Sequence, residues 1–152
     1  MATNKKAVNF TLKNTKGEET TLFDETKKGK VVLLFFPLAF TGVCTAEMCT
    51  TRDNMKMYNA LNASVFGISV DSHHTLREFK KQNNLNFELL SDFNKEVSRA
   101  YDSFYKEFKG LKGVAKRSAF VINQENEIIY KEVLENSSEE PDYKKIAEAL
   151  SK

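Results

Sequence analysis

An unbroken apolar run, VVLLFF at residues 31–36, is the feature that most constrains how this chain can fold. The run combines β-branched and aromatic residues, and Pro37, which follows it, cannot donate a hydrogen bond within a central strand. A strand with no polar residue on either face has to be covered on both, as in the parallel sheets of α/β proteins. The sequence therefore predicts a buried strand at 31–36 that ends at Pro37.

On both sides of this strand, local patterns predict further elements. Helices are predicted at about 44–61, 73–84, 94–105 and 142–152. Asp71 and Ser72 offer N-cap side chains for the second of these, and Pro141 is expected to be the first-turn proline of the last. Apolar and alternating runs predict strands at 64–70 and 87–91, and hairpins that pair 7–12 with 18–23 and 118–123 with 127–133. Two glycines predict a loop at 109–114.

The order of these elements indicates the fold class. A strand, a helix and a strand in succession imply a right-handed parallel crossover, whereas the two hairpins imply antiparallel edges. We therefore expect an α/β protein of thioredoxin-like fold, in which helices flank a mixed β-sheet that carries an N-terminal β-hairpin. With 152 residues, of which 41% are hydrophobic, the chain can form one sizeable core, and we expect a single domain over residues 1–152.

Charge and hydropathy restrict the partners. The 23 basic and 21 acidic residues nearly cancel, so the overall charge favours neither nucleic acid nor an anionic membrane as a partner. The first residues, MATNKKAVNFTLKN, lack the apolar run of a signal peptide, and no stretch approaches the roughly 20 apolar residues of a membrane span. We expect a cytoplasmic protein. In that reducing compartment its two cysteines are expected to be inert and buried, metal-bound or catalytic, rather than a structural disulfide.

Cys44 lies where a thiol becomes reactive. It falls in the first turn of the helix predicted after the buried strand and the loop LAFTGV. Backbone N–H groups without helical partners and the positive end of the helix dipole favour a thiolate there, and the thiolate is the nucleophilic form. This position is a physical reason for a reactive Cys44, whereas a lone buried cysteine is usually an inert apolar residue.

The residues around Cys44 resemble the active-site signature of the peroxiredoxins. Pro37, Thr41 four residues later and Cys44 three residues beyond reproduce that signature, and PLAFTGVCTAE looks most like the AhpE type. The segments SVDSHHTLREF, FELLSD and KRSAFVIN are similar to later parts of the family, so that the resemblance covers essentially the whole chain. It implies a thiol-dependent peroxidase without metal, haem or flavin.

The resemblance also implies roles for individual residues. Cys44 corresponds to the peroxidatic cysteine, which attacks the nearer oxygen of a hydroperoxide and becomes a sulfenic acid. Thr41 is expected to hold the peroxide through its hydroxyl group. Arg117 is expected to favour the thiolate and to donate hydrogen bonds to the peroxide oxygens, where charge develops.

Three further residues are expected to support this group. The backbone N–H groups of Val43 and Cys44 are expected to complete the set of donors around the peroxide. Pro37 is expected to cover the site and limit the access of water. Glu47, one turn along the helix, is expected to orient Arg117.

Cys49 follows Cys44 by five residues, a spacing shared with the Q-type peroxiredoxins, or bacterioferritin comigratory proteins, in which the second cysteine resolves the sulfenic acid. The AhpE-like loop normally lacks this residue, so the sequence combines features of two subfamilies. Five residues of helix rotate by ~500° and place the two Cα atoms roughly 9 Å apart, whereas a disulfide tolerates about 7 Å at most. If the two cysteines pair, the first turn and a half of the helix has to unwind. The alternative is a one-cysteine cycle that an external thiol resolves.

Other features of the sequence allow further interpretations. His73 and His74 are adjacent and lack zinc-site spacing with the cysteines, so we expect no metal there. The aromatic cluster between residues 101 and 108 could line the peroxide pocket, form a dimer contact or pack in the core. Cys44 could also serve a peroxide sensor or chaperone, and a thioredoxin-type oxidoreductase is disfavoured because the chain has no C-x-x-C motif. We expect a hydroperoxide substrate, a thioredoxin- or glutaredoxin-like reductant, and a monomer or homodimer.

Overall fold

The apolar run forms the central strand β4 (Val31–Phe35), and all five of its residues are completely buried. The computed structural model describes residues 5–136 and 138–152, so the first four residues of the N-terminal segment lie outside it. β4 pairs in parallel with β5 (Ser64–Ser69) and antiparallel with β9 (Ser118–Ile122). The predicted buried strand is therefore confirmed, and it lies in the interior of the sheet.

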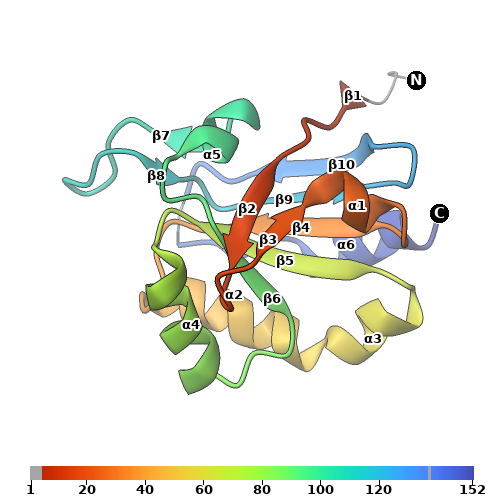
Figure 1. Ribbon diagram of the computed structural model, residues 1–152, viewed down its shortest axis with the longest axis horizontal. Coiled ribbons are helices and arrows are strands. Elements are labelled where there is room, and N and C mark those ends of the chain that lie inside the picture. Colours follow the sequence, from red (N-terminus) through yellow and green to blue (C-terminus); the bar gives the residue numbers. More distant parts are fainter. Residues whose placement is uncertain (1–4, 137) are drawn as a thin grey trace.

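The main sheet has eight strands in the order β1-β10-β9-β4-β5-β6-β2-β3 (Figure 1). The remaining strands are β1 (Lys5–Lys6), β2 (Thr11–Asn14), β3 (Glu19–Thr21), β6 (Glu88–Ser91) and β10 (Glu127–Val133). β4, β5 and β6 run parallel, and the other pairings are antiparallel. This arrangement confirms the predicted mixed sheet and both predicted hairpins.

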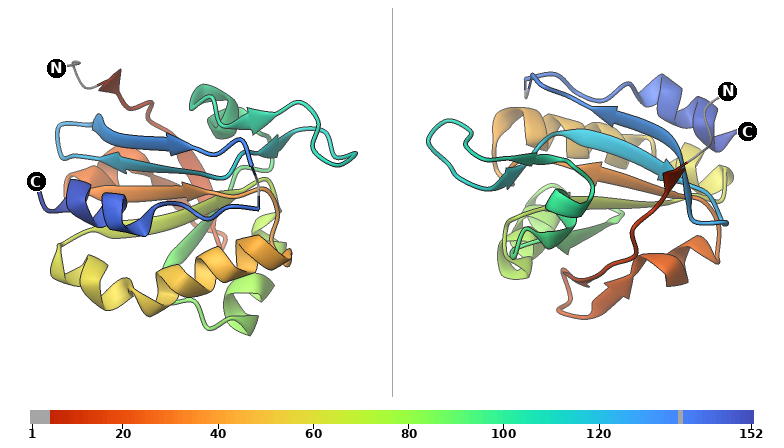
Figure 2. Two further views of the ribbon diagram at one scale, coloured as in Figure 1. Left: turned by 180° about the vertical axis from the view of Figure 1, so that it is seen from behind. Right: turned by 90° about the horizontal axis from the view of Figure 1, so that it is seen from above.

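Helices cover both faces of the sheet, because alternate residues of β4 point to opposite sides. The helices are α1 (Leu22–Thr26), α2 (Gly42–Asp53), α3 (Met55–Ala60), α4 (His73–Gln82), α5 (Glu96–Ala100) and α6 (Tyr143–Leu150). Val32 and Leu34 pack with residues of α2, α3, α4 and α6, whereas Leu33 and Phe35 pack with residues of α1 and α5. Figure 2, in the view from above, shows α2, α3 and α6 on one side of the strands and α1 on the other.

The helix predicted for 44–61 begins earlier than expected and is interrupted. Cys44 does lie in its first turn, but α2 starts at Gly42, and Asn54 separates α2 from α3. Asn54 has φ −98° and ψ 2°, outside the helical range, and asparagine is among the weaker helix formers. The chain therefore bends before α3 packs against β5.

The helix predicted for 94–105 is wrong over its second half. α5 ends at Ala100, and Asp102 takes a left-handed conformation with φ 55°. The Ser103 hydroxyl group then bonds that of Ser118 on β9 at 2.6 Å. This long-range contact directs the chain into a strand rather than into further helical turns.

The segment after α5 is a second, small sheet instead of a helix followed by a loop. β7 (Phe104–Tyr105) pairs with β8 (Val114–Ala115), and the hairpin between them projects from the body of the molecule (Figures 1 and 2). Its tip is a two-residue turn closed by both backbone hydrogen bonds between Phe108 and Leu111, at 2.7 and 2.8 Å. Lys109 and Gly110 have φ of 51° and 81°, a pair of positive values that glycine at the second position favours.

Other boundaries also differ from the predictions, and the strand predicted for 7–12 is found at Thr11–Asn14. The strand predicted for 18–23 ends at Thr21, where the Asn9 side chain accepts the N–H of Phe23 at 3.0 Å and the chain enters α1. Pro141 precedes the first turn of α6, because Asp142 is the N-cap and its side chain accepts the N–H of Lys145 at 3.2 Å. Within the described ranges, no helix is long and apolar enough to cross a membrane.

Candidate active site

Cys44 lies at the carboxyl end of the parallel strands, in the first turn of α2. Thr41 occupies the N-cap position with extended backbone angles, φ −97° and ψ 156°, and Gly42 begins the helix. Cys44 is 1% exposed. The N–H groups of Val43 and Cys44 belong to the first turn of α2, where backbone N–H groups have no acceptor within the helix.

Arg117 reaches the same point from β9. Because Ser118 pairs with Phe35 at the end of β4, the residue before Ser118 lies beside the start of α2. The Arg117 Nη2 donates a hydrogen bond to the Cys44 Sγ at 3.2 Å, and the arginine is 2% exposed. A buried guanidinium in contact with the sulfur favours its anionic, nucleophilic form.

Glu47 lies behind Arg117 and is completely buried. Its Oε1 accepts a hydrogen bond from the Arg117 Nη1 at 2.7 Å, whereas its Oε2 has no partner among the described residues. Burial raises the pKa of Glu47 from its ordinary 4.5 to about 8, although the adjacent Arg117 opposes the shift. The buried carboxyl group thus positions the guanidinium next to the Cys44 sulfur.

The Thr41 hydroxyl group is oriented by the backbone. It donates to the carbonyl oxygen of Leu38 at 2.8 Å and makes no capping bond to the N–H groups of α2. Since its hydrogen is committed to Leu38, the hydroxyl oxygen is available as an acceptor. A hydroperoxide O–H group is a suitable donor to it.

These side chains surround a pocket of about 310 Å³ with Cys44 and Arg117 in its wall. The other lining residues are Pro37, Leu38, Thr41, Gly42, Val43, Phe108, Lys109, Leu111 and Ser138. The structure thus brings together the sequence-predicted Pro37, Thr41, Val43, Cys44 and Arg117, and it places Glu47 directly behind the arginine.

The tip of the β7–β8 hairpin supplies part of the pocket, which was one of the possibilities open for the aromatic cluster. Lys109 and Leu111 line it together with Phe108, the one member of the aromatic cluster that does so. Tyr105 stacks on Phe108, with ring centroids 4.9 Å apart, whereas Tyr101 is buried in the core. Gly110 indicated a turn in the sequence, but a turn residue does not show that the hairpin lies next to Cys44.

Cys49 faces away from this pocket. Both cysteines are free thiols, and they lie within one uninterrupted helix. Cys49 is partly exposed, and its Sγ donates to the Asn83 Oδ1, next to the end of α4, at 3.7 Å. In this state the two sulfur atoms therefore have different neighbours and cannot form a bond.

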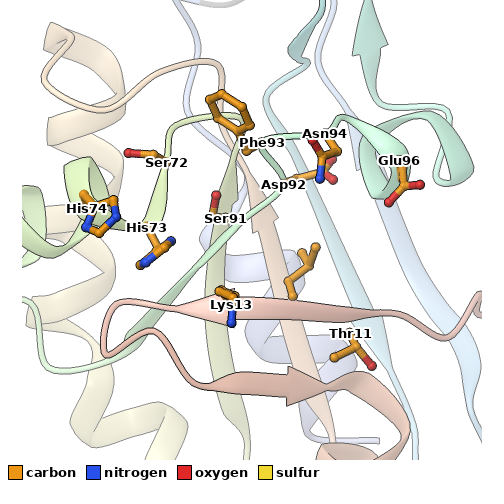
Figure 3. A pocket seen from close by; sticks show the side chains of 11 residues that line it. Thr11, Lys13, Ser72, His73, His74, Ser91, Asp92, Phe93, Asn94 and Glu96 are labelled. Carbon is orange, nitrogen blue, oxygen red and sulfur yellow. The ribbon is translucent and has the colours of Figure 1, made fainter.

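A second pocket, of about 370 Å³, lies apart from the cysteines. Figure 3 shows it between β2, the start of α4 and the segment after β6, with His73 and His74 side by side on α4. The two rings are 4.1 Å apart. Neither cysteine lines it, and among the residues described no group of three or more His, Cys, Asp or Glu side chains could hold a metal ion.

Comparison with known proteins gives consistent results. The sequence model of the AhpC/TSA family matches residues 3–131. Peroxiredoxin Bcp of Bacillus subtilis is 37% identical over 131 residues, which cover 82% of this chain and 80% of that protein. Alkyl hydroperoxide reductase E of Mycobacterium bovis is 33% identical over 129 residues, covering 84% and 82%. The crystal structure of peroxidoxin BcpB from Mycobacterium tuberculosis superimposes with a TM-score of 0.88 at 28% identity, over 99% of this chain and 97% of that one.

Proposed function

The chain belongs to the AhpC/TSA family and is a peroxiredoxin, a thiol-dependent peroxidase, and on this basis we propose that Cys44 is the peroxidatic cysteine and Cys49 the resolving one. The observation that carries the assignment is the hydrogen bond of 3.2 Å from the Arg117 guanidinium to the Cys44 sulfur in the wall of the pocket. Within the part of the chain that the structure describes, the Cys49 sulfur hydrogen-bonds to the Asn83 amide and to no guanidinium or ammonium group.

In the first step, the Cys44 thiolate attacks the nearer oxygen of a hydroperoxide. A sulfur–oxygen bond forms, the oxygen–oxygen bond breaks, and the leaving alkoxide or hydroxide takes a proton and departs as an alcohol or water. Arg117 and the N–H groups of Val43 and Cys44 donate to the oxygens as negative charge develops, while Thr41 accepts from the peroxide O–H. One well-placed donor of this kind contributes ~3 kcal/mol to the lowering of the barrier.

In the second step, the Cys49 thiol attacks the sulfur of the Cys44 sulfenic acid. A disulfide forms, the sulfur–oxygen bond breaks, and the hydroxyl group leaves as water with the proton of Cys49. Because residues five apart in a helix have Cα atoms roughly 9 Å apart, the start of α2 has to unwind before the bond can form. A thioredoxin- or glutaredoxin-type dithiol then reduces the disulfide and is itself oxidised.

The proposal extends to substrate range and setting. The pocket admits hydrogen peroxide and small organic hydroperoxides, and the cycle uses only thiols and peroxide, so it needs no metal, haem or flavin. Each turnover starts from two free thiols, which suits a reducing compartment such as the cytoplasm. We propose that the enzyme works there as a monomer or homodimer.

Serine substitutions test the two roles separately. Cys44→Ser is expected to abolish peroxide consumption with a thioredoxin system. Cys49→Ser is expected to consume one equivalent of peroxide in a burst and to accumulate the Cys44 sulfenic acid, which mass spectrometry detects. Full activity of Cys44→Ser would overturn the assignment of the nucleophile. A wild-type protein that stops at a sulfenic acid, with no intramolecular disulfide, would replace the two-cysteine cycle by a one-cysteine cycle.

A further inference from the structure

Cys49 is held in the folded helix by the residue that follows α4. The Cys49 Sγ lies 3.7 Å from the Asn83 Oδ1. The Asn83 Nδ2 donates to the carbonyl oxygen of Phe79 at 3.0 Å, which fixes the amide so that its oxygen faces the thiol. An amide oxygen only accepts hydrogen bonds, so it bonds Cys49 as the protonated thiol, the weaker nucleophile.

The next turn of α2 is attached to the same region by different bonds. The Arg52 Nη1 donates to the backbone carbonyl of Asn83 at 2.7 Å, and the Asn86 Nδ2 donates to the carbonyl of Arg52 at 3.3 Å. Neither bond involves Cys49. α2 therefore has two parts. The first part contains both cysteines, and the second part contains Arg52, whose hydrogen bonds attach it to the residues after α4.

Disulfide formation breaks one of these attachments and can leave the other intact. Unwinding of α2 from Gly42 as far as Cys49, about two turns, moves Cys49 away from Asn83, while Arg52 keeps its bonds to Asn83 and from Asn86. A bond present in the folded state and absent from the unwound state stabilises the folded helix, and so it lowers the population from which the disulfide forms.

We propose that Asn83 is a positioning residue for the resolving step, which holds Cys49 in the folded helix and thereby slows its attack on the sulfenic acid. The inference rests on the resolving role proposed for Cys49. When α2 unwinds, Cys49 leaves Asn83, loses its proton and attacks the Cys44 sulfur; the disulfide forms and the sulfenic oxygen departs as water. A slower attack lengthens the life of the sulfenic acid, which a second peroxide can oxidise to sulfinic acid.

Two variants of Asn83 separate this role from a purely structural one. Asn83→Ala removes both the acceptor for Cys49 and the donor to Phe79, whereas Asn83→Asp removes the donor but keeps an acceptor oxygen. Each protein is mixed with one equivalent of hydrogen peroxide, quenched at intervals, and its sulfenic acid and disulfide are quantified by mass spectrometry. The formation of sulfinic acid during turnover at excess peroxide is measured in parallel.

The acceptor role predicts different rates for the two variants. Asn83→Ala is expected to form the disulfide about three- to fivefold faster than the wild type, as the loss of one weak hydrogen bond implies, and to yield less sulfinic acid. Asn83→Asp is expected to form it no faster than the wild type. The first step, oxidation of Cys44, is expected to keep its rate in both.

Three results would contradict the inference or its premise, and they are distinguishable. Equal acceleration in both variants would assign the effect to the lost bond with Phe79, and unchanged rates in both would remove Asn83 from the reaction. If the wild type forms no intramolecular disulfide at all, the resolving role of Cys49 fails first.

Discussion

Glu47 is a buried carboxyl group whose proton decides how the charge of Arg117 is shared. Arg117 donates to both the Glu47 carboxyl group and the Cys44 sulfur, so ionisation of Glu47 changes the charge beside the guanidinium that contacts Cys44. Its raised pKa, about 8, places this change just above neutral pH. The residue therefore links the charge of the active site to the stability of the fold.

Glu47→Gln tests this link, because glutamine keeps the shape of the carboxyl group and stays neutral. The folded protein binds more protons at Glu47 than the unfolded chain between pH 4.5 and about 8, so its contribution to stability is complete below pH 4.5 and is lost as the pH rises through 8. The free energy of unfolding of the wild type, relative to Glu47→Gln, is expected to fall by up to about 1.4 kcal/mol per pH unit across this range. Urea titrations at several pH values measure it, and a constant difference would contradict the shift.

Most of the site was predictable at the level of residues because the donors around Cys44 follow from a compact motif. Pro37, Thr41, Val43 and Cys44 lie within eight positions of one another, and only Arg117 is distant, 73 positions from Cys44. The interaction of Cys49 with Asn83 was not predictable, because it depends on how α2 and α4 pack rather than on a local pattern.

At the scale of elements, α2 performs two tasks that conflict. In the proposed cycle, it has to be folded to present Cys44 to Arg117, and it has to unwind for Cys49 to reach Cys44. The bonds of Arg52 with Asn83 and Asn86 indicate where the unwinding stops, since they hold the last turns in place. The change of structure is thus expected to be confined to the first part of the helix.

Hydrogen exchange before and after oxidation measures this change. Amides at 45–50 are expected to exchange at least tenfold faster in the disulfide form, because their helical hydrogen bonds are lost, while those of β4 keep their protection. Cys49→Ser treated with peroxide is the control, and it is expected to retain slow exchange throughout. Equal exchange of the reduced and disulfide forms over 45–50 would show that the pairing requires no unwinding.

Elements with strong local signals were predicted, and those governed by distant contacts were not. β4, β5 and β9 follow from apolar runs, and α4 follows from its N-cap Ser72, which accepts the N–H of Thr75. The false helix over 101–105 looked helical locally, but the contact of Ser103 with Ser118 forms only in the complete sheet.

At the scale of the whole molecule, Gly67 lies where β5 is in close contact with β6, with α2 and with Phe36. A Cβ atom at this position of β5 would lie 2.7 Å from the Leu89 Cδ2, 3.1 Å from the Met48 Sδ and 3.2 Å from the Phe36 Cε1. Met48 belongs to α2, so the packing of α2 against the sheet depends on the absence of a side chain at position 67. Any larger residue has to displace the core around it.

Gly67→Ala is therefore expected to lower the free energy of unfolding by about 1–3 kcal/mol, the usual cost of overpacking a core. Gly42→Ala is the matched control for stability, because a Cβ there meets no atom within 4 Å. Urea denaturation of both variants measures the difference. Equal unfolding midpoints would show that the core around β5 can absorb the added methyl group.

The size of the active-site pocket has a consequence for how the enzyme tells peroxide from solvent. A volume of 310 Å³ corresponds to about ten molecules of liquid water at ~30 Å³ each, far more than hydrogen peroxide fills. The cavity is therefore larger than hydrogen peroxide requires, and its volume alone does not select the oxidant over water. Discrimination falls to the reaction itself, since only a molecule with a weak oxygen–oxygen bond gives the sulfur a group to expel.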